Sequence, residues 1–237
     1  MRVLVGTSGY SYKEWKGPFY PEDVPARRFL SFYAAHLPTV EINNTFYRMP
    51  TTKLVEGWAS EVPEGFTFAL KAPQRITHIA KLKDAGELLG AFGRVAGTLG
   101  LRLGPLLFQL PPFMRKDVER LSSFLDQIGA LPQRPRVAFE FRHASWFDDE
   151  VWAALRAHGA ALCVAEGEAL QSPLVATADW GYLRLRRDAY PDALVSEWAQ
   201  KILAQPWSEA YVYIKHDDGD APSVAKRLTE ALGSTAR

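Results

Sequence analysis

The 237 residues include a single cysteine, Cys163, which excludes an internal disulfide and any metal cage built from several thiolates. Cys163 lies in the apolar run 161–165, so we expect a small buried hydrophobe rather than a nucleophile. No apolar run approaches the roughly 18 residues that a membrane-spanning helix needs. The first residues are also too short an apolar run for a signal peptide. We therefore expect a cytoplasmic protein that does not contact membranes.

The chain has almost no net charge, because 28 Lys and Arg residues face 27 Asp and Glu residues. This balance argues against a dedicated basic surface for nucleic acid, although it leaves room for a local positive cleft. No Walker loop occurs and no Gly-x-Gly-x-x-Gly follows a strand, so we expect no nucleotide cofactor. The histidines are scattered, so we expect no metal and no other cofactor. Nothing in the composition argues against a monomer.

Short β-rich runs alternate with amphipathic stretches along the whole length, a pattern typical of parallel strands joined by helical crossovers. The chain length is close to what one eight-fold barrel needs. We therefore predict a single α/β domain over residues 1–237, a (β/α)8 TIM-barrel-like fold. The sixth crossover, 167–179, is short and weakly helical, so the barrel is predicted to be irregular there. The eight predicted strands are 3–9, 39–46, 66–73, 105–111, 136–143, 161–166, 180–187 and 210–217.

The first connection, residues 9–26, is long and rich in aromatic side chains. Long loops without regular structure are often functional or lid-like. Two interpretations stay open for this one. Its rings, Tyr12 and Trp15 among them, could stack on a ligand, or they could plug the barrel with aromatic surface.

Polar side chains gather where the predicted strands end, which is the catalytic face of a parallel barrel. Alternation along each strand points Glu41 with Asn43, and Glu140 with Arg142, toward the barrel interior. The same alternation points Arg184, Arg186 and Lys215 inward. We predict Glu140, Glu41 and Lys71 as catalytic residues. The predicted substrate-binding residues are Thr7, Ser8, Tyr12, Trp15, Asn43, His78, Gln109, Arg142, His143, Trp146, Arg184, Arg186 and Lys215.

These residues suit an enzyme that acts on a small polyhydroxylated or phosphorylated, anionic substrate. Glu140 and Glu41 could exchange protons, with the pKa of one raised by burial and the other held ionised by a cation. Lys71 could hold an enolate or carbonyl oxygen, or form a Schiff base. The arginines would grip phosphate or carboxylate through their planar forks.

Three alternatives remain open from the residues alone. The charges could form a satisfied salt-bridge lattice in which Glu41, Glu140, Glu166 and Asp217 pair with Lys71, Arg142, Arg184 and Lys215. The chain could instead be a metal-dependent phosphodiester hydrolase or nuclease, with ligands drawn from Glu140, Glu166, His216 and Asp217. It could also be a ligand-binding barrel without turnover.

Several strings together resemble the YecE-like family, domain of unknown function 72. They are VGTSGY at 5–10, VEINNTFY at 40–47, KAP at 71–73 with ITH at 76–78, LFQLPP at 107–112, and FEFRH at 139–143 followed by SWF. The resemblance implies a TIM-barrel-like fold and a remote, fold-level relation to sugar isomerases, but no particular reaction. Two strings depart from the family pattern, YLRLRR at 182–187 in place of YxRxHG, and KHDD at 215–218 in place of an Asn-Asn-Asp-like end. Both departures weaken any role carried over to Arg186 and Lys215.

Overall fold

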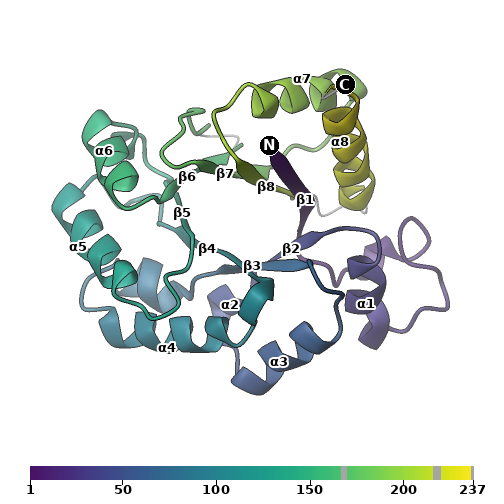
Figure 1. Cartoon of the computed structure of the whole chain (residues 1–237), viewed down its shortest axis with the longest axis horizontal. Coiled ribbons are helices and arrows are strands. Elements are labelled where there is room, and N and C mark those ends of the chain that lie inside the picture. Colours follow the sequence, from purple (N-terminus) through teal and green to yellow (C-terminus); the bar gives the residue numbers. More distant parts are fainter. Residues whose placement is uncertain (167–169, 216–219, 236–237) are drawn as a thin grey trace.

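The computed structural model is a closed barrel of eight parallel strands in chain order, with helices around the outside (Figure 1). It describes residues 1–166, 170–215 and 220–235. All eight predicted strands are confirmed, most of them shorter than predicted. Their bounds are β1 Arg2–Ser8, β2 Thr39–Ile42, β3 Thr67–Lys71, β4 Leu103–Gln109, β5 Val137–Glu140, β6 Ala161–Ala165, β7 Trp180–Leu185 and β8 Glu209–Ile214.

The outer helices bury one apolar side each against the barrel, and two of them begin at a carboxylate cap. The Asp117 side chain accepts from the Arg120 amide at 3.0 Å, and Asp148 caps the next helix in the same way. The helices are α1 Phe29–Ala34, α2 Asn44–Tyr47, α3 Thr52–Ser60, α4 Gly86–Gly97, α5 Val118–Gly129, α6 Asp149–Ala157, α7 Asp192–Leu203 and α8 Ala221–Thr235. Shorter helical turns are Lys13–Trp15, Ala26–Arg28, Arg75–Ile79, Gly100–Arg102 and Ala144–Trp146. No helix in these described ranges is long and apolar enough to cross a bilayer.

Two connections bear on the sequence-based expectations. The sixth crossover is irregular as predicted, since its described part, residues 170–179, contains no helix. The second strand ends at Ile42 rather than at residue 46, because residues 44–47 turn into α2. This early end moves Asn43 and Phe46 off the strand and onto the rim of the barrel.

The core has an inner and an outer part, as alternation along parallel strands requires. The outer part lies between strands and helices and includes Val40, Ile42 and most of the aromatic rings. The inner part fills the barrel and includes Leu107, Cys163 and Tyr182. Cys163 is buried there, as its apolar surroundings predicted. The inner part forms the floor beneath the polar side chains described below.

Candidate functional site

A layer of polar side chains closes the barrel at the C-terminal ends of its strands. Each strand that contributes to it has an inward-facing polar residue at its last or last-but-one position, above an apolar or tyrosine layer, because alternate residues share a face. Hydrogen bonds and mutual electrostatic effects join these side chains. The structure thereby brings together Ser8, Glu41, Asn43, Lys71, Gln109, Glu140, Arg142 and Arg184 from six different strands and their ends.

Arg184 is the centre of this layer, because its guanidinium bridges two carboxylates that come from β2 and β5. Its Nε lies 2.9 Å from Oε2 of Glu41, and its Nη2 donates to Oε1 of the same group at 3.0 Å. Its Nη1 donates to Oε2 of Glu140. All three side chains are buried. A planar fork shared by two carboxylates is the geometry in which arginine forms its strongest hydrogen bonds.

Glu41 is fully buried and is surrounded by donors besides Arg184. The hydroxyl of Tyr182 donates to Oε2 at 2.7 Å, and Asn43 Nδ2 lies 3.2 Å from Oε1. The Ser8 hydroxyl donates to Oε1 as well. Burial alone would raise the pKa of Glu41, but Arg184 and these donors hold it below its ordinary value. Glu41 is therefore a carboxylate at neutral pH.

Glu140 is held in the same charge state by a separate set of donors. Gln109 Nε2 donates to its Oε1 at 2.7 Å, and Arg142 Nε donates to the same oxygen at 2.9 Å. Burial would raise the pKa of Glu140, but Arg184 and Arg142 lower it to about 2. The expectation that burial raises the pKa of one of the two glutamates is thus not met. Both are ionised, because nearby cations and hydrogen-bond donors lower each pKa by more than burial raises it.

Lys71 differs from its charged neighbours because it lacks an acidic partner. Its side chain is 9% exposed, and its Nζ lies 4.1 Å from the centre of the Phe46 ring. Among the described residues it forms no ion pair and no side-chain hydrogen bond. Burial and then the charge of Arg184 lower the pKa of Lys71 to about 8, although Glu140 and Glu41 oppose the shift. The hydroxyl of Thr45, 2.6 Å from the Lys71 carbonyl oxygen, fixes its backbone.

Half-buried side chains surround this layer on the rim. His78 packs edge-on against the Phe46 ring, with centroids 4.9 Å apart, and its pKa is lowered by burial and by Lys71. The Tyr12 hydroxyl donates to the Ser8 carbonyl at 2.7 Å, which places it beside the end of β1. These positions agree with the predicted neighbourhood and leave any contact with a substrate as a prediction.

Two further predicted residues, His143 and Lys215, lie just beyond the ends of β5 and β8. The ring Nδ1 of His143 accepts from the Ser145 amide at 3.1 Å, so the neutral ring carries its proton on Nε2. Lys215 follows β8 and is half-buried, and its backbone N–H donates to Leu185. Their roles in binding remain predictions.

The structure does not support the inward placement that was predicted for Arg186, and it turns the side chain of Thr7 outward. Thr7 faces α1, where the hydroxyl groups of Thr7 and Tyr33 are 2.8 Å apart. Arg186 is exposed, because β7 ends at Leu185 and the alternation that would have turned Arg186 inward stops there. Thr7 is therefore not placed to contact a ligand in the barrel mouth, and Arg186 loses the alternation on which its predicted role rested.

Two predicted tryptophans are buried in the outer core instead of lining the mouth. Trp15 is fully buried and packs against Tyr12 and Tyr20. Trp146 is also fully buried, stacks on Phe141, and donates its indole N–H to the Met114 carbonyl at 2.7 Å. Neither ring can reach a ligand without leaving the core. For the first connection, this placement favours the packing interpretation over the lid.

Glu166 also lies outside the site. It therefore belongs neither to the salt-bridge lattice nor to the metal ligands for which it was a candidate. It is buried on the outer side of the barrel, where Arg187 Nε donates to it at 2.7 Å and Trp198 Nε1 at 3.2 Å. Of the remaining metal-ligand candidates, Glu140 belongs to the polar layer, and His216 and Asp217 lie outside the described residues. Within the described ranges, no three His, Cys, Asp or Glu side chains come together.

Two residues that shape the site are not among those predicted from the sequence. Tyr182 bonds to Glu41, and Phe46 covers Lys71. Tyr182 could have been found, because it precedes Arg184 by two residues on the same strand and so shares its face. Phe46 could not, because it acts from a helical turn that the sequence pattern did not indicate.

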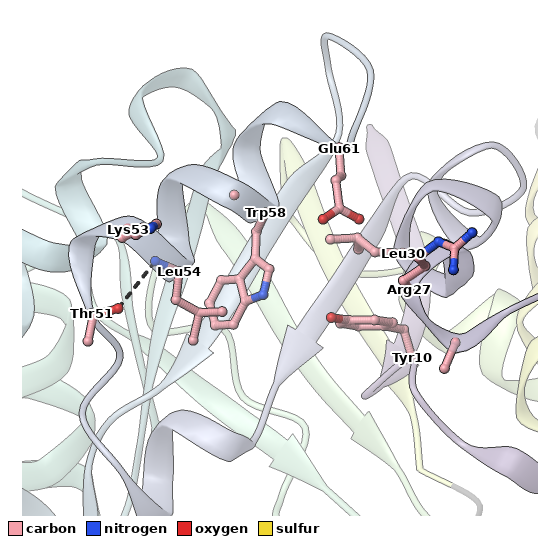
Figure 2. A pocket seen from close by; sticks show the side chains of 10 residues that line it. Tyr10, Arg27, Leu30, Thr51, Lys53, Leu54, Trp58 and Glu61 are labelled. Carbon is pink, nitrogen blue, oxygen red and sulfur yellow. Dashed lines mark hydrogen bonds between the residues drawn. The ribbon is translucent and has the colours of Figure 1, made fainter.

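A separate hollow lies outside the barrel, between α1 and α3. Its volume is about 540 Å³, and Tyr10 and Trp58 face each other across it (Figure 2). Gly57 on α3 and Leu30 on α1 form part of its wall. None of the predicted site residues lines this groove, so it is distinct from the barrel mouth.

The closed parallel ring and the polar layer at its C-terminal end define a (β/α)8 barrel whose candidate site lies where enzymes of this fold carry theirs. The chain belongs to the family described as "Protein of unknown function DUF72", whose model matches residues 4–237.

Relatives in this family include proteins known by sequence and by structure. The UPF0759 protein YunF of Bacillus subtilis is 30% identical over 61% of this chain and 52% of its own length. The UPF0759 protein YecE of Escherichia coli is 33% identical over 50% of the chain and 43% of its own length. The chain thus matches about half the length of these relatives. A DUF72 family protein from Thermotoga maritima superposes with a TM-score of 0.83 at 28% identity, covering 98% of this chain and 100% of the other.

Proposed function

We propose that the chain is an enzyme that acts, at the mouth of the barrel, on a small polyhydroxylated or phosphorylated anionic substrate. The observation that carries this proposal is the state of Lys71, a buried lysine with no acidic partner among the described residues and a pKa of about 8. A group with a pKa this close to neutral pH has both protonation states accessible, so it can both release and take up a proton. A side chain that served only the lattice would be paired.

The charge of the layer supports an anionic substrate. Three cationic side chains, Lys71, Arg142 and Arg184, act on the two carboxylates Glu41 and Glu140. Three positive against two negative charges leave an excess of one positive charge among these described residues while Lys71 is protonated. A phosphate or carboxylate group of a substrate would neutralise that excess.

Arg142 is the side chain best placed to receive the anion. It is 38% exposed at its side chain, whereas Arg184 is almost wholly buried by the two carboxylates. In the described part of the chain, Arg142 bonds through its Nε to Glu140, and no hydrogen bond engages its two terminal nitrogens. The fork of Arg142 is therefore oriented by Glu140 and open toward solvent, as bidentate binding of phosphate requires.

The ionised glutamates then have a positioning role in place of the proton exchange first expected of them. A carboxylate with a pKa near 2 is a weak base, so Glu140 is better suited to orient Arg142 and Arg184 than to remove a proton. Proton transfer falls to Lys71, with His78 as the neutral base nearby, because burial and Lys71 lower the pKa of His78.

A ligand screen with a matched pair of variants tests the binding part of this proposal. Thermal unfolding of the wild type would be followed with sugar phosphates, free sugars, short oligonucleotides and divalent metals. A ligand at about one hundred times its Kd adds roughly 2.7 kcal/mol of stability, which raises the Tm by about 5–10 °C for a chain of this size. Sugar phosphates should give this shift, Arg142→Ala should abolish it, and the exposed Arg186→Ala should keep it.

Proton transfer is tested with the compound that the screen identifies. The protein and compound are incubated in D2O, and exchange of carbon-bound hydrogen is followed by proton NMR. Exchange by the wild type and none by Lys71→Met is the expected result. Binding without exchange would instead support the barrel that binds without turnover. A shift produced by metals or oligonucleotides alone would favour the hydrolase.

A further inference from the structure

Lys71 has no ion-pair partner among the described residues, although a lysine that only attracted an anionic substrate could be paired. The two carboxylates that act on Lys71, Glu41 and Glu140, form their ion pairs with Arg184, and neither forms an ion pair with Lys71 in the described part of the chain. The amine instead lies against the face of the Phe46 ring. Placing an ammonium at a largely buried position with no carboxylate partner among the described residues is unfavourable. The Phe46 ring face compensates a positive charge less than a paired carboxylate would, so this placement favours the uncharged amine more than an ion-paired site does.

We infer that Lys71 is a nucleophile that forms an imine with an aldehyde or ketone carbonyl of the substrate. This inference rests on the proposed function and narrows its substrate to carbonyl compounds that also carry an anionic group. The carbonyl carbon would lie at Nζ of Lys71, and the anion would lie at the open fork of Arg142. The barrel places both residues at the same end, on the ends of β3 and β5.

The free amine is the species that attacks a carbonyl, so its abundance decides the rate of imine formation. With a pKa of about 8, Lys71 is neutral in roughly one molecule in ten at pH 7. An ordinary lysine with the reference pKa of 10.5 is neutral in roughly one in 3,000. The environment of Lys71 therefore enriches the reactive form about 300-fold. Burial contributes most to this lowered pKa, the charges of Arg184 and Arg142 lower it further, and Glu140 and Glu41 oppose the shift.

The proposed step is balanced without any further reagent. The lone pair of Nζ forms a bond to the carbonyl carbon as the C=O π bond breaks, and a proton passes from Nζ to the carbonyl oxygen to give a neutral carbinolamine. Loss of that hydroxyl as water, with a proton taken from solvent, leaves the protonated imine. Its positive nitrogen draws electrons from the neighbouring carbon, so the hydrogen on that carbon becomes acidic and can pass to a base such as neutral His78.

Reductive trapping tests the imine on the wild-type chain. D-glyceraldehyde 3-phosphate and, separately, neutral D-glyceraldehyde are added at pH 7 with sodium cyanoborohydride, which delivers hydride to an imine and fixes it as a secondary amine. Digestion and mass spectrometry then locate the modified lysines. Lys53 is exposed and serves as the reference within the same sample. Lys71→Arg keeps the charge but cannot form this imine.

The expected result is labelling of Lys71 about tenfold or more faster than Lys53, because the larger free-amine fraction is only partly offset by restricted access. The phosphorylated aldehyde should label Lys71 faster than the neutral one, and Arg142→Ala should remove that difference. Even labelling of exposed lysines with Lys71 untouched overturns the imine. If D-glyceraldehyde 3-phosphate still raises the Tm of the wild type but not of Arg142→Ala, the proposed function stands without the imine. If no compound binds or labels, both fail.

Discussion

Replacing Lys71 with methionine should make the folded chain more stable at pH 7, which is the opposite of what most core substitutions do. Methionine has a similar length and suits the contact with Phe46, while the unfavourable buried charge disappears. The size of the effect follows from the pKa of Lys71, about 8 in the folded chain against 10.5 in its ordinary state. That difference corresponds to about 3 kcal/mol of unfolding free energy, or roughly 6–12 °C in Tm.

The sign of the pH dependence separates this explanation from a general packing effect. Below pH 8 the lysine is protonated in both the folded and the unfolded chain, so the folded state carries the whole penalty. Between pH 8 and 10.5 the folded chain loses its proton first, so wild-type stability rises with pH relative to the variant. About 1.3 kcal/mol of the difference should vanish between pH 7 and pH 9.

Urea unfolding of both proteins at these two pH values, followed by tryptophan fluorescence, measures the difference. Lys53→Met is the matched control, because Lys53 is exposed and its replacement should change stability by less than about 0.5 kcal/mol at either pH. A Lys71→Met variant that is less stable than the wild type at both pH values would show that Lys71 is held by an ion pair, and the argument for a functional lysine would fail.

Three further substitutions test the rest of the layer. Glu140→Gln should make the free energy of unfolding less dependent on pH in the acid range. The pKa of Glu140 is lowered from 4.5 to about 2, so its contribution of about 3 kcal/mol is complete above pH 4.5 and is lost as the pH falls toward 2. Urea titrations of both proteins at pH 6 and pH 3 would detect the difference. Arg184→Met should lower the free energy of unfolding by about 3–5 kcal/mol, because two buried carboxylates lose their partner. The control Arg186→Met replaces an exposed arginine and should change the free energy of unfolding by less than about 0.5 kcal/mol. Equal effects of the two substitutions would refute the bridge. Glu166→Gln should lower the Tm yet preserve the ligand-induced shift, since its contacts lie outside the barrel, and a lost shift would bring Glu166 back into the site.

The sequence predicted the barrel and most of the charged layer because both depend on one regularity. Strands alternating with helices indicate parallel pairing, and alternation within a strand decides which side chains face inward. Glu41, Lys71, Glu140 and Arg184 all lie within strands and are placed as that alternation predicts. The regularity ends with the strand.

The remaining residues depended on where each strand stops and on contacts between distant segments. Arg186 follows the last residue of β7 and is exposed, so alternation no longer places it. Glu166 continues the outer face of Leu162 and Val164 on β6, so alternation could have placed it outside the barrel. Trp146 is fixed by a carbonyl 32 residues earlier in the chain, which no local pattern indicates. The protonation state of Glu41 was equally inaccessible, because burial and hydrogen bonding act on its pKa in opposite directions and only the structure counts the donors.

The position of Arg184 has a consequence for how the molecule could have been assembled. Its partners lie 143 and 44 residues earlier, on β2 and β5, so the bridge joins three strands that are not neighbours in the ring (Figure 1). These contacts exist only once the ring has closed. A shorter chain that stopped before β7 would have both carboxylates without the cation that neutralises them. Their mutual repulsion and the cost of burying them would destabilise a closed arrangement of the remaining strands. The mouth of this barrel is therefore a property of the complete circle, and it could not have been inherited intact from either half.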